Sequence, residues 1–219
     1  MSDGALRLSI PPAQGLWCAD LHEPALRVSA VQSGNWSGPV GSTRGQSPFR
    51  DDLVVREEQP TVLGFTPLYG RIEVTCRARI GPRSMFSAWM IGLEDEPDRR
   101  GEICLIEVFG DAIGEDAGTP VVQHGCGIKE IRDPALTQDF DTMPLRRRRR
   151  RPSVCGVLDT GRRGLPGRRR RGTALGRVAG VPAGADPWGV RLPGARADPD
   201  EVPATPELVV SRVVWELMR

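Results

Sequence analysis

Apolar and polar residues alternate along much of the chain, in short runs separated by turns that contain glycine and proline. The alternation is cleanest at residues 25–33, and it is typical of a strand with one buried and one solvent-facing side. Similar patterns predict strands at residues 5–10, 53–56, 72–80, 85–91, 101–110, 121–128 and 207–215. Short strands at regular spacing favour two packed sheets over an α/β fold. We therefore predict an all-β protein with an antiparallel β-sandwich.

Two carboxylates, Glu102 and Glu107, stand in the otherwise apolar run of residues 101–110. Because successive side chains of a strand point to opposite faces, a regular strand would turn Glu107 away from the face of Glu102. One extra residue near Leu105 or Ile106, a β-bulge, would return Glu107 to that face. Two carboxyls would then project together from an apolar background.

The glutamate pair has two interpretations. Two glutamates in one strand are often solvated charges at a sheet edge, and spacing alone favours that interpretation. Two carboxyls about 5–5.5 Å apart are also the apparatus of retaining glycoside hydrolysis. In that reaction one carboxylate attacks the sugar and the other carboxyl protonates the leaving oxygen. The residues around the pair favour the second interpretation.

Three motifs follow one another here: Tyr-Gly-Arg-Ile-Glu at residues 69–73, Ser-Ala-Trp-Met-Ile-Gly at 87–92 and Glu-Ile-Cys-Leu-Ile-Glu at 102–107. Their order and spacing resemble glycoside hydrolase family 16, the laminarinase and lichenase family. The resemblance covers roughly residues 20–143 and 197–215. It implies a concanavalin A-like jelly roll that cleaves β-linked glucans or galactans with retention.

The resemblance also implies roles for individual residues. By position, Glu102 matches the nucleophile and Glu107 the acid/base. Cys104 stands where most members have an Asp that tunes the protonation of both glutamates, and a thiol is mostly uncharged at neutral pH. The implied partner is a polysaccharide or oligosaccharide substrate, and the chemistry needs no metal and no organic cofactor.

Three further side chains are candidates for contacting a substrate. Trp89 matches a tryptophan strand of the family and is the better candidate for the substrate cleft. Trp36 lies in a loop of turn-forming residues, where an exposed ring could stack on a sugar, although ordinary packing is the favoured interpretation. His124 lies in the next predicted strand, where a histidine contacts substrate in some members; a structural or surface role is the alternative.

Length and composition fit one sandwich domain, with 219 residues of which 39% are apolar. No apolar run approaches the length of about 20 residues that spans a membrane. We therefore expect no membrane anchor. The N-terminus lacks a charged segment followed by an apolar one, so we also expect no signal peptide. The localisation stays open, because members of the family are often secreted. The five cysteines are irregularly spaced, which favours small core residues over a zinc site or disulfides. We expect a monomer.

The composition changes abruptly at Pro144. Residues 144–196 contain fifteen Arg against two Asp, a net charge of +13, whereas the rest of the chain carries −11. Such a segment buries too little apolar surface to order itself, so we expect it to be irregular or disordered. We accordingly divide the chain into the main part of the sandwich at 1–143, the aberrant segment at 144–196 and a terminal strand of the sandwich at 197–219.

The arginine-rich segment has two functional interpretations. It could bind phosphate backbones, but it lacks the interleaved aromatic residues that stack on bases, so we expect no nucleic-acid partner. We favour a shifted reading frame over about residues 145–195, because Arg-Arg codons read one base on give Asp-Val, which alternates as a strand should. A sandwich that lacks adjacent strands exposes core faces and edges. An inactive or carbohydrate-binding sandwich is therefore the alternative to a glycosidase.

The frame hypothesis makes a prediction about the gene. We expect a single-base insertion or deletion near codon 145, compensated near codon 195, to restore a segment with alternating apolar residues. Sequencing the coding DNA checks this, and a gene in which no such change restores a strand pattern contradicts it.

Overall fold

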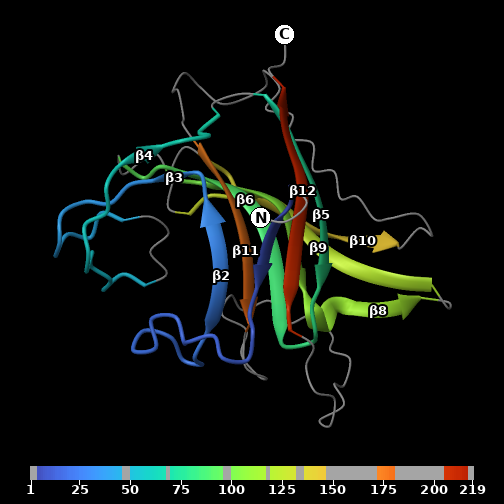
Figure 1. Cartoon of the computed structure of the whole chain (residues 1–219). Coiled ribbons are helices and arrows are strands. Elements are labelled where there is room, and N and C mark those ends of the chain that lie inside the picture. Colours follow the sequence, from blue (N-terminus) through green and yellow to red (C-terminus); the bar gives the residue numbers. More distant parts are fainter. Residues whose placement is uncertain are drawn as a thin grey trace.

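The computed structural model describes residues 4–45, 50–67, 70–95, 100–116, 119–131, 136–146, 172–180 and 205–216, and nearly every element in them is a strand (Figure 1). The strands are β1 (Leu6–Ser9), β2 (Arg27–Gln32), β3 (Gly34–Asn35), β4 (Val62–Leu63), β5 (Arg71–Arg79), β6 (Ser84–Gly92), β7 (Glu102–Phe109), β8 (Ile113–Asp116), β9 (Thr119–Lys129), β10 (Asp139–Arg146), β11 (Gly172–Gly180) and β12 (Glu207–Glu216). A 3-10 turn, η1 (Gly110–Ala112), joins β7 to β8. Among the described residues, no helix has the length and apolar character to cross a membrane.

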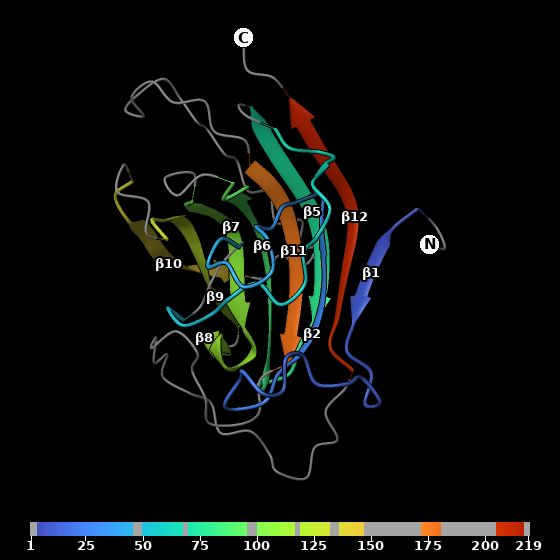
Figure 2. The ribbon, with the colours of Figure 1, turned by 90° about the vertical axis from the view of Figure 1, so that its left-hand side faces the viewer.

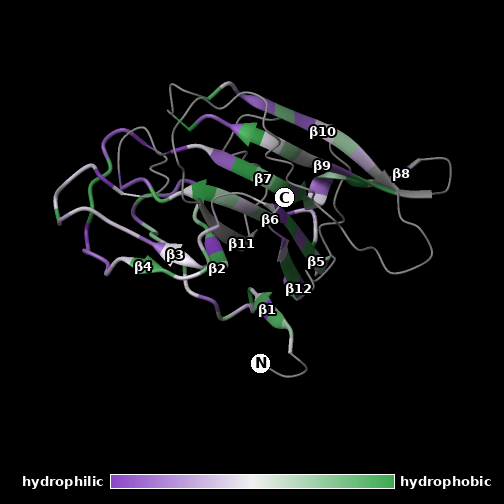
Figure 3. Ribbon diagram, turned by 90° about the horizontal axis from the view of Figure 1, so that it is seen from above, coloured by the Kyte–Doolittle hydropathy of each residue, from purple (hydrophilic) through white to green (hydrophobic). Residues whose placement is uncertain are grey.

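The strands form two main sheets, and every pairing is antiparallel. The large sheet has the order β10-β9-β7-β6-β11-β2, with β8 paired to β9, and the small sheet has the order β1-β12-β5. The side view separates β1, β12 and β5 from β7, β8, β9 and β10 (Figure 2), and the view from above shows the small sheet beside the large one (Figure 3). The prediction of an all-β antiparallel sandwich is confirmed.

The core lies between the two layers and draws on both sheets. Leu8, Ile72, Cys76 and Leu208 come from the small sheet, and Phe86, Ala88, Leu105, Ile106 and Val108 come from the large sheet. On β6 the core residues Phe86 and Ala88, and Met90 packed against the core, follow one another at every second position, as the period of two requires. The packing therefore decides which face of the large sheet remains available for chemistry.

The large sheet contains the β-bulge that the glycosidase interpretation of the glutamate pair requires. Ala88 of β6 lies opposite Ile106, but the next residue, Trp89, lies opposite Cys104, so Leu105 is the extra residue of β7. The pairing with β9 shifts at the same place, between Cys104 and Glu107. Both Leu105 and Ile106 belong to the core cluster. The bulge thus allows two consecutive apolar residues to be buried and reverses the alternation beyond them.

The arginine-rich segment departs from expectation at one place. Residues 172–180 form β11, a strand between β6 and β2 inside the large sheet, so the expectation of an irregular segment is wrong there. Strand β10 also continues to Arg146, just beyond the predicted boundary at Pro144. Residues 147–171 and 181–204 lie outside the described residues, and the predictions about them stay predictions. The terminal strand β12 pairs with both β1 and β5, which joins the two ends of the described chain in one sheet.

The core position of Ile106 generates a stability prediction. Only 2% of its surface is exposed, so Ile106→Ala should lower the free energy of unfolding by about 2–5 kcal/mol, through lost burial and the cavity left behind. The matched control is Val213→Ala, because Val213 is 51% exposed and should change stability by no more than about 0.5 kcal/mol. Urea denaturation measures both, and equal effects of the two substitutions would contradict the placement of Ile106.

Candidate functional site

Three adjacent strands place a set of polar and aromatic residues on the face of the large sheet that points away from the core. Residues directly opposite one another in paired strands share a face, so the register identifies the set. We call it the site face; its members are Ser87, Trp89 and Ile91 of β6, Glu102, Cys104 and Glu107 of β7, and Gly125, Gly127 and Lys129 of β9. The bulge is what puts Glu107 in this set.

The two carboxylates of β7 converge on one lysine. The Lys129 Nζ lies 3.3 Å from Oε1 of Glu102 and 3.3 Å from Oε2 of Glu107. The nearest oxygens of the two glutamates are therefore at most twice that distance apart. This limit accommodates the roughly 5–5.5 Å separation at which a carboxyl pair hydrolyses glycosides with retention.

The three charged groups are largely enclosed. The side chains of Glu102, Glu107 and Lys129 are only 15%, 14% and 23% exposed. Burial alone would lower the pKa of Lys129, but the neighbouring charges of Glu102 and Glu107 outweigh burial and raise that pKa above its ordinary value. Lys129 is therefore a cation at neutral pH, and the trio carries a net charge of −1 when both carboxyls are ionised.

Cys104 contributes a neutral group between the two carboxylates. It is 3% exposed, and its Sγ lies 3.9 Å from the carbonyl oxygen of Gly125, which accepts a weak S–H hydrogen bond. Burial, followed by the charge of Glu107, raises the pKa of the thiol to about 12. The sequence-based expectation of an uncharged residue at this position thus agrees with its surroundings, and the charge of the site comes from Glu102, Glu107 and Lys129.

A phenyl ring from β10 covers part of β9. A Cβ added at Gly125 would overlap the Phe140 side chain, and one added at Gly127, which has a φ of +134°, would overlap the carbonyl oxygen of Asp139. Glycine is therefore required at both positions, for close approach at Gly125 and also for backbone conformation at Gly127. The Phe140 ring centroid lies 4.8 Å from the Lys129 Nζ, a cation–π contact.

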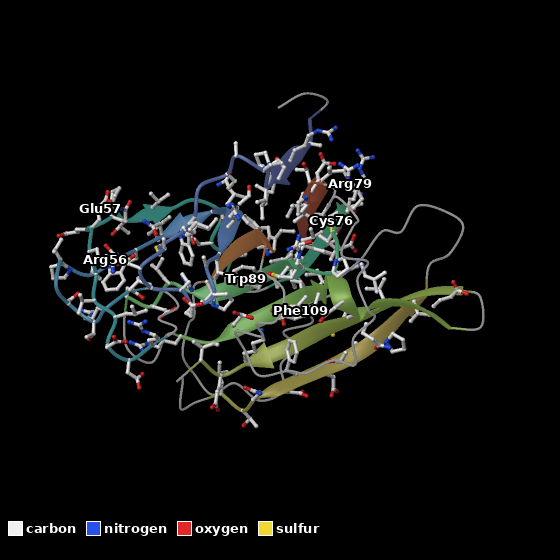
Figure 4. All side chains as sticks on the ribbon, turned by 90° about the horizontal axis from the view of Figure 1, so that it is seen from below. Arg56, Glu57, Cys76, Arg79, Trp89 and Phe109 are labelled. Carbon is white, nitrogen blue, oxygen red and sulfur yellow. The ribbon has the colours of Figure 1, made fainter. Side chains whose placement is uncertain are left out.

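The two predicted tryptophans occupy different places. Trp89 is half-buried on the site face, directly opposite Cys104, and lies on β6 near the middle of the large sheet (Figure 4). Trp36 is half-buried in the loop after β3, where the Arg44 guanidinium lies 5.0 Å from its ring centroid. Arg44 also donates a hydrogen bond to the carbonyl oxygen of Asp95, beyond the end of β6. Trp36 is thus linked to the loop that leads toward β7 and not directly to the carboxylates.

The structure does not bring His124 to the glutamates. Its neighbours Gln123 and Gly125 alternate with it along β9, and Gly125 is the residue opposite Glu107. His124 therefore points to the other face of the sheet, where it lies opposite Met143 of β10. Its Nδ1 is buried without a hydrogen-bond partner among the described atoms.

Lys129 and Phe140 are the members of the site that sequence reasoning missed. One signal was present, because Lys129 is the only lysine in a chain with 29 arginines. The strand predicted at residues 121–128 ends one residue before Lys129, and no strand is predicted around Phe140. Among the described residues, no group of three or more His, Cys, Asp or Glu side chains is arranged to hold a metal ion.

No protein-family model and no curated protein sequence matches the chain. Solved structures with a similar fold include glycoside hydrolases. An endo-β-galactosidase from Clostridium perfringens that releases GlcNAcα1-4Gal aligns with a TM-score of 0.56 at 17% identity, over 99% of this chain and 52% of that one. The chain thus spans about half the length of that structure.

Two further structures align with lower scores. The laminarinase catalytic domain of Thermotoga maritima has a TM-score of 0.40 at 13% identity, over 88% of this chain and 79% of that one. A family 16 enzyme of Bacteroides ovatus, from a locus for mixed-linkage glucan, has a TM-score of 0.38 at 10% identity, over 99% of this chain and 96% of that one. Identities this low establish the fold alone, and the argument for it rests on the clostridial enzyme.

The environment of Cys104 generates a reactivity prediction. With a pKa of about 12, the thiol is almost entirely protonated at pH 8, and its burial blocks access as well. Alkylation by iodoacetamide should therefore be at least about a thousandfold slower in the folded protein than in the urea-denatured chain. Peptide mass spectrometry gives the rate at each cysteine, with half-exposed Cys18 as the internal control. Equal rates for Cys104 and Cys18 in the folded protein would contradict this geometry.

Proposed function

We propose that this protein is a glycoside hydrolase of the family 16 type, which cleaves β-linked polysaccharide by a retaining double displacement. Glu102 is the nucleophile and Glu107 the acid/base. One observation carries the proposal: the bulge at Leu105 turns both carboxylates to one face, where they meet at Lys129. A pair of solvated charges at a sheet edge does not account for this, because β7 lies between β6 and β9 and both glutamates are largely enclosed.

The reaction divides between the two carboxyls. The Glu102 carboxylate attacks the anomeric carbon while the Glu107 carboxyl protonates the oxygen of the departing sugar. A covalent glycosyl-enzyme results, and Glu107, now ionised, takes a proton from the water that attacks the same carbon, which breaks the bond to Glu102 and releases its carboxylate. Two inversions leave the configuration of the product unchanged. Both steps are proton transfers and nucleophilic displacements that side chains carry out.

Trp89 is the proposed sugar-binding side chain nearest the carboxylates. Its place beside Cys104 puts a half-buried ring on the site face, where an apolar face of a sugar can stack on it. Trp36 is a more distant candidate, in the loop linked to the end of β6 through Arg44. We propose a β-glucan-like substrate, and the endo-β-galactosidase of similar fold makes a β-galactan the alternative to include in assays.

A binding protein without catalysis is the second candidate, and the charges of the site favour it. Lys129 attracts both carboxylates, whereas an acid/base must hold a proton at the start of the reaction. Cys104 offers a neutral thiol where a third carboxylate would favour a proton on a neighbouring glutamate through like-charge repulsion. Binding of a glycan without release of reducing ends would identify this outcome.

Substitution of each glutamate tests the assignment. Glu102→Gln should abolish release of reducing ends from laminarin, lichenan or agarose, because no nucleophile remains. Glu107→Gln should slow the same hydrolysis by about 10²–10⁴-fold but slow cleavage of a dinitrophenyl β-glycoside much less, because that leaving group departs without a proton. Reducing-sugar assays and absorbance of released dinitrophenol measure the two effects.

The matched control is Glu115→Gln, because Glu115 is an exposed glutamate of β8 outside the site face. It should leave every rate unchanged. Full activity in Glu102→Gln would refute the nucleophile, and binding without hydrolysis by the unaltered chain would replace the enzyme by the second candidate.

A further inference from the structure

The ammonium group of Lys129 contacts three side chains of the site. It lies 3.3 Å from Glu102, and it donates to both carboxylate oxygens of Glu107, at 3.3 and 3.4 Å. Its third neighbour is the Phe140 ring. An ammonium has three donors, and these neighbours satisfy or shield them. The role of Lys129 is therefore not to bind an anionic substrate, because its ammonium already interacts with side chains of the protein.

The position of Lys129 depends on the strands that flank it. In register it stands directly opposite Glu102, at the last residue of β9. Gly125 and Gly127 have no side chains that would hold Phe140 away from β9, and Phe140 comes to lie against the lysine. Contacts thus run in series from β10 through Phe140 and Lys129 to the two glutamates of β7.

The charges around the lysine explain why a cation is needed there. Two ionised carboxylates that share a largely enclosed site repel each other, and the repulsion is strong where water is excluded. On β7 and β9 the groups of the site face that carry or could carry charge are Glu102, Cys104, Glu107 and Lys129. The facing residues of β6 are Ser87, Trp89 and Ile91, and those of β10 are Phe140 and Thr142, none of which is charged. Beyond β6, the register partner of Ser87 on β11 is Arg177.

We propose that Lys129 is a positioning residue of this site: it holds Glu102 and Glu107 toward one point and supplies the charge that allows both to occupy an enclosed face. A carboxyl at position 104 would make three acids around the lysine. The neutral thiol of Cys104 leaves two, so the side chains at positions 104 and 129 together set the charge of the site. The proposal deepens the glycosidase assignment, but its main test needs no catalysis.

The test is a double-mutant cycle read at two pH values. Lys129→Met keeps a long apolar side chain and removes the charge, and it is combined with Glu102→Gln and Glu107→Gln. At pH 7.5, Lys129→Met should lower the urea midpoint by on the order of 1 M, because it leaves two carboxylates without a cation. In the background of both glutamine substitutions the same change should have little effect, because no charge remains to be compensated.

The pH dependence has a definite sign. Without the lysine, the folded state favours a proton on the crowded carboxyls more than the unfolded state does, so folding of the variant is strengthened as the pH falls. The gap between wild type and Lys129→Met should therefore narrow from pH 7.5 to pH 4. Arg56→Met is the control, because Arg56 pairs with Asp20 on the exposed surface. The urea midpoint of Arg56→Met at pH 7.5 should fall far less than that of Lys129→Met.

The outcomes separate this proposal from the assignment of catalysis. An equal loss of stability at both pH values, or an undiminished loss with both glutamates replaced, would show that Lys129 only packs and would overturn the proposal. If the unaltered chain cleaves a glycan, Lys129→Met should also move the high-pH limb of its rate profile to higher pH, because a carboxyl without the cation keeps its proton longer. Lys129→Arg should restore part of this shift. A chain without hydrolytic activity leaves the double-mutant cycle fully informative.

Discussion

The extra residue in β7 is the constraint on which the site depends. Leu105 and Ile106 are both buried in the core, and only a bulge lets two consecutive residues of a strand point to the same side. Without it, Glu107 would enter the core and an apolar side chain would take its place beside Glu102. Burial of an unpaired carboxylate costs several kcal/mol, and exposure of Ile106 would forfeit the burial of a large side chain. Core packing therefore holds the direction of Glu107.

Charge compensation is the second requirement, and it involves a different strand. Two carboxylates on an enclosed face attract a cation, and β9 provides Lys129 at the position opposite Glu102. The glycines of β9 matter for the same reason, since they admit Phe140 from β10 to within cation–π distance of the lysine. The chemistry proposed for β7 thus relies on side chains from β9 and β10 for its electrostatics.

The large sheet also contains a strand whose residues have a low intrinsic preference for extended structure. Strand β11 reads Gly-Thr-Ala-Leu-Gly-Arg-Val-Ala-Gly, and its three glycines weaken the intrinsic preference for an extended chain. It nevertheless pairs on both sides, with β6 along its whole length and with β2 over most of it. Hydrogen bonds to two neighbours offset a weak local preference, which is why a pattern confined to the segment did not reveal the strand. Because β6 carries Trp89, this pairing also supports one wall of the proposed site.

The amino-acid sequence by itself determined the relations that are local along the chain. The alternation of apolar residues indicated antiparallel strands, and the spacing of Glu102 and Glu107 showed that only a bulge would bring both carboxyls to one face, because both inferences follow from the period of two within one strand. The tertiary structure alone decided which strands lie side by side and in what register. That decision paired Lys129 with Glu102, brought Phe140 over Gly125, turned His124 to the opposite face and inserted β11 beside β6. The physical reason is that register is set by the burial of whole faces against a partner sheet, which no single stretch of sequence contains.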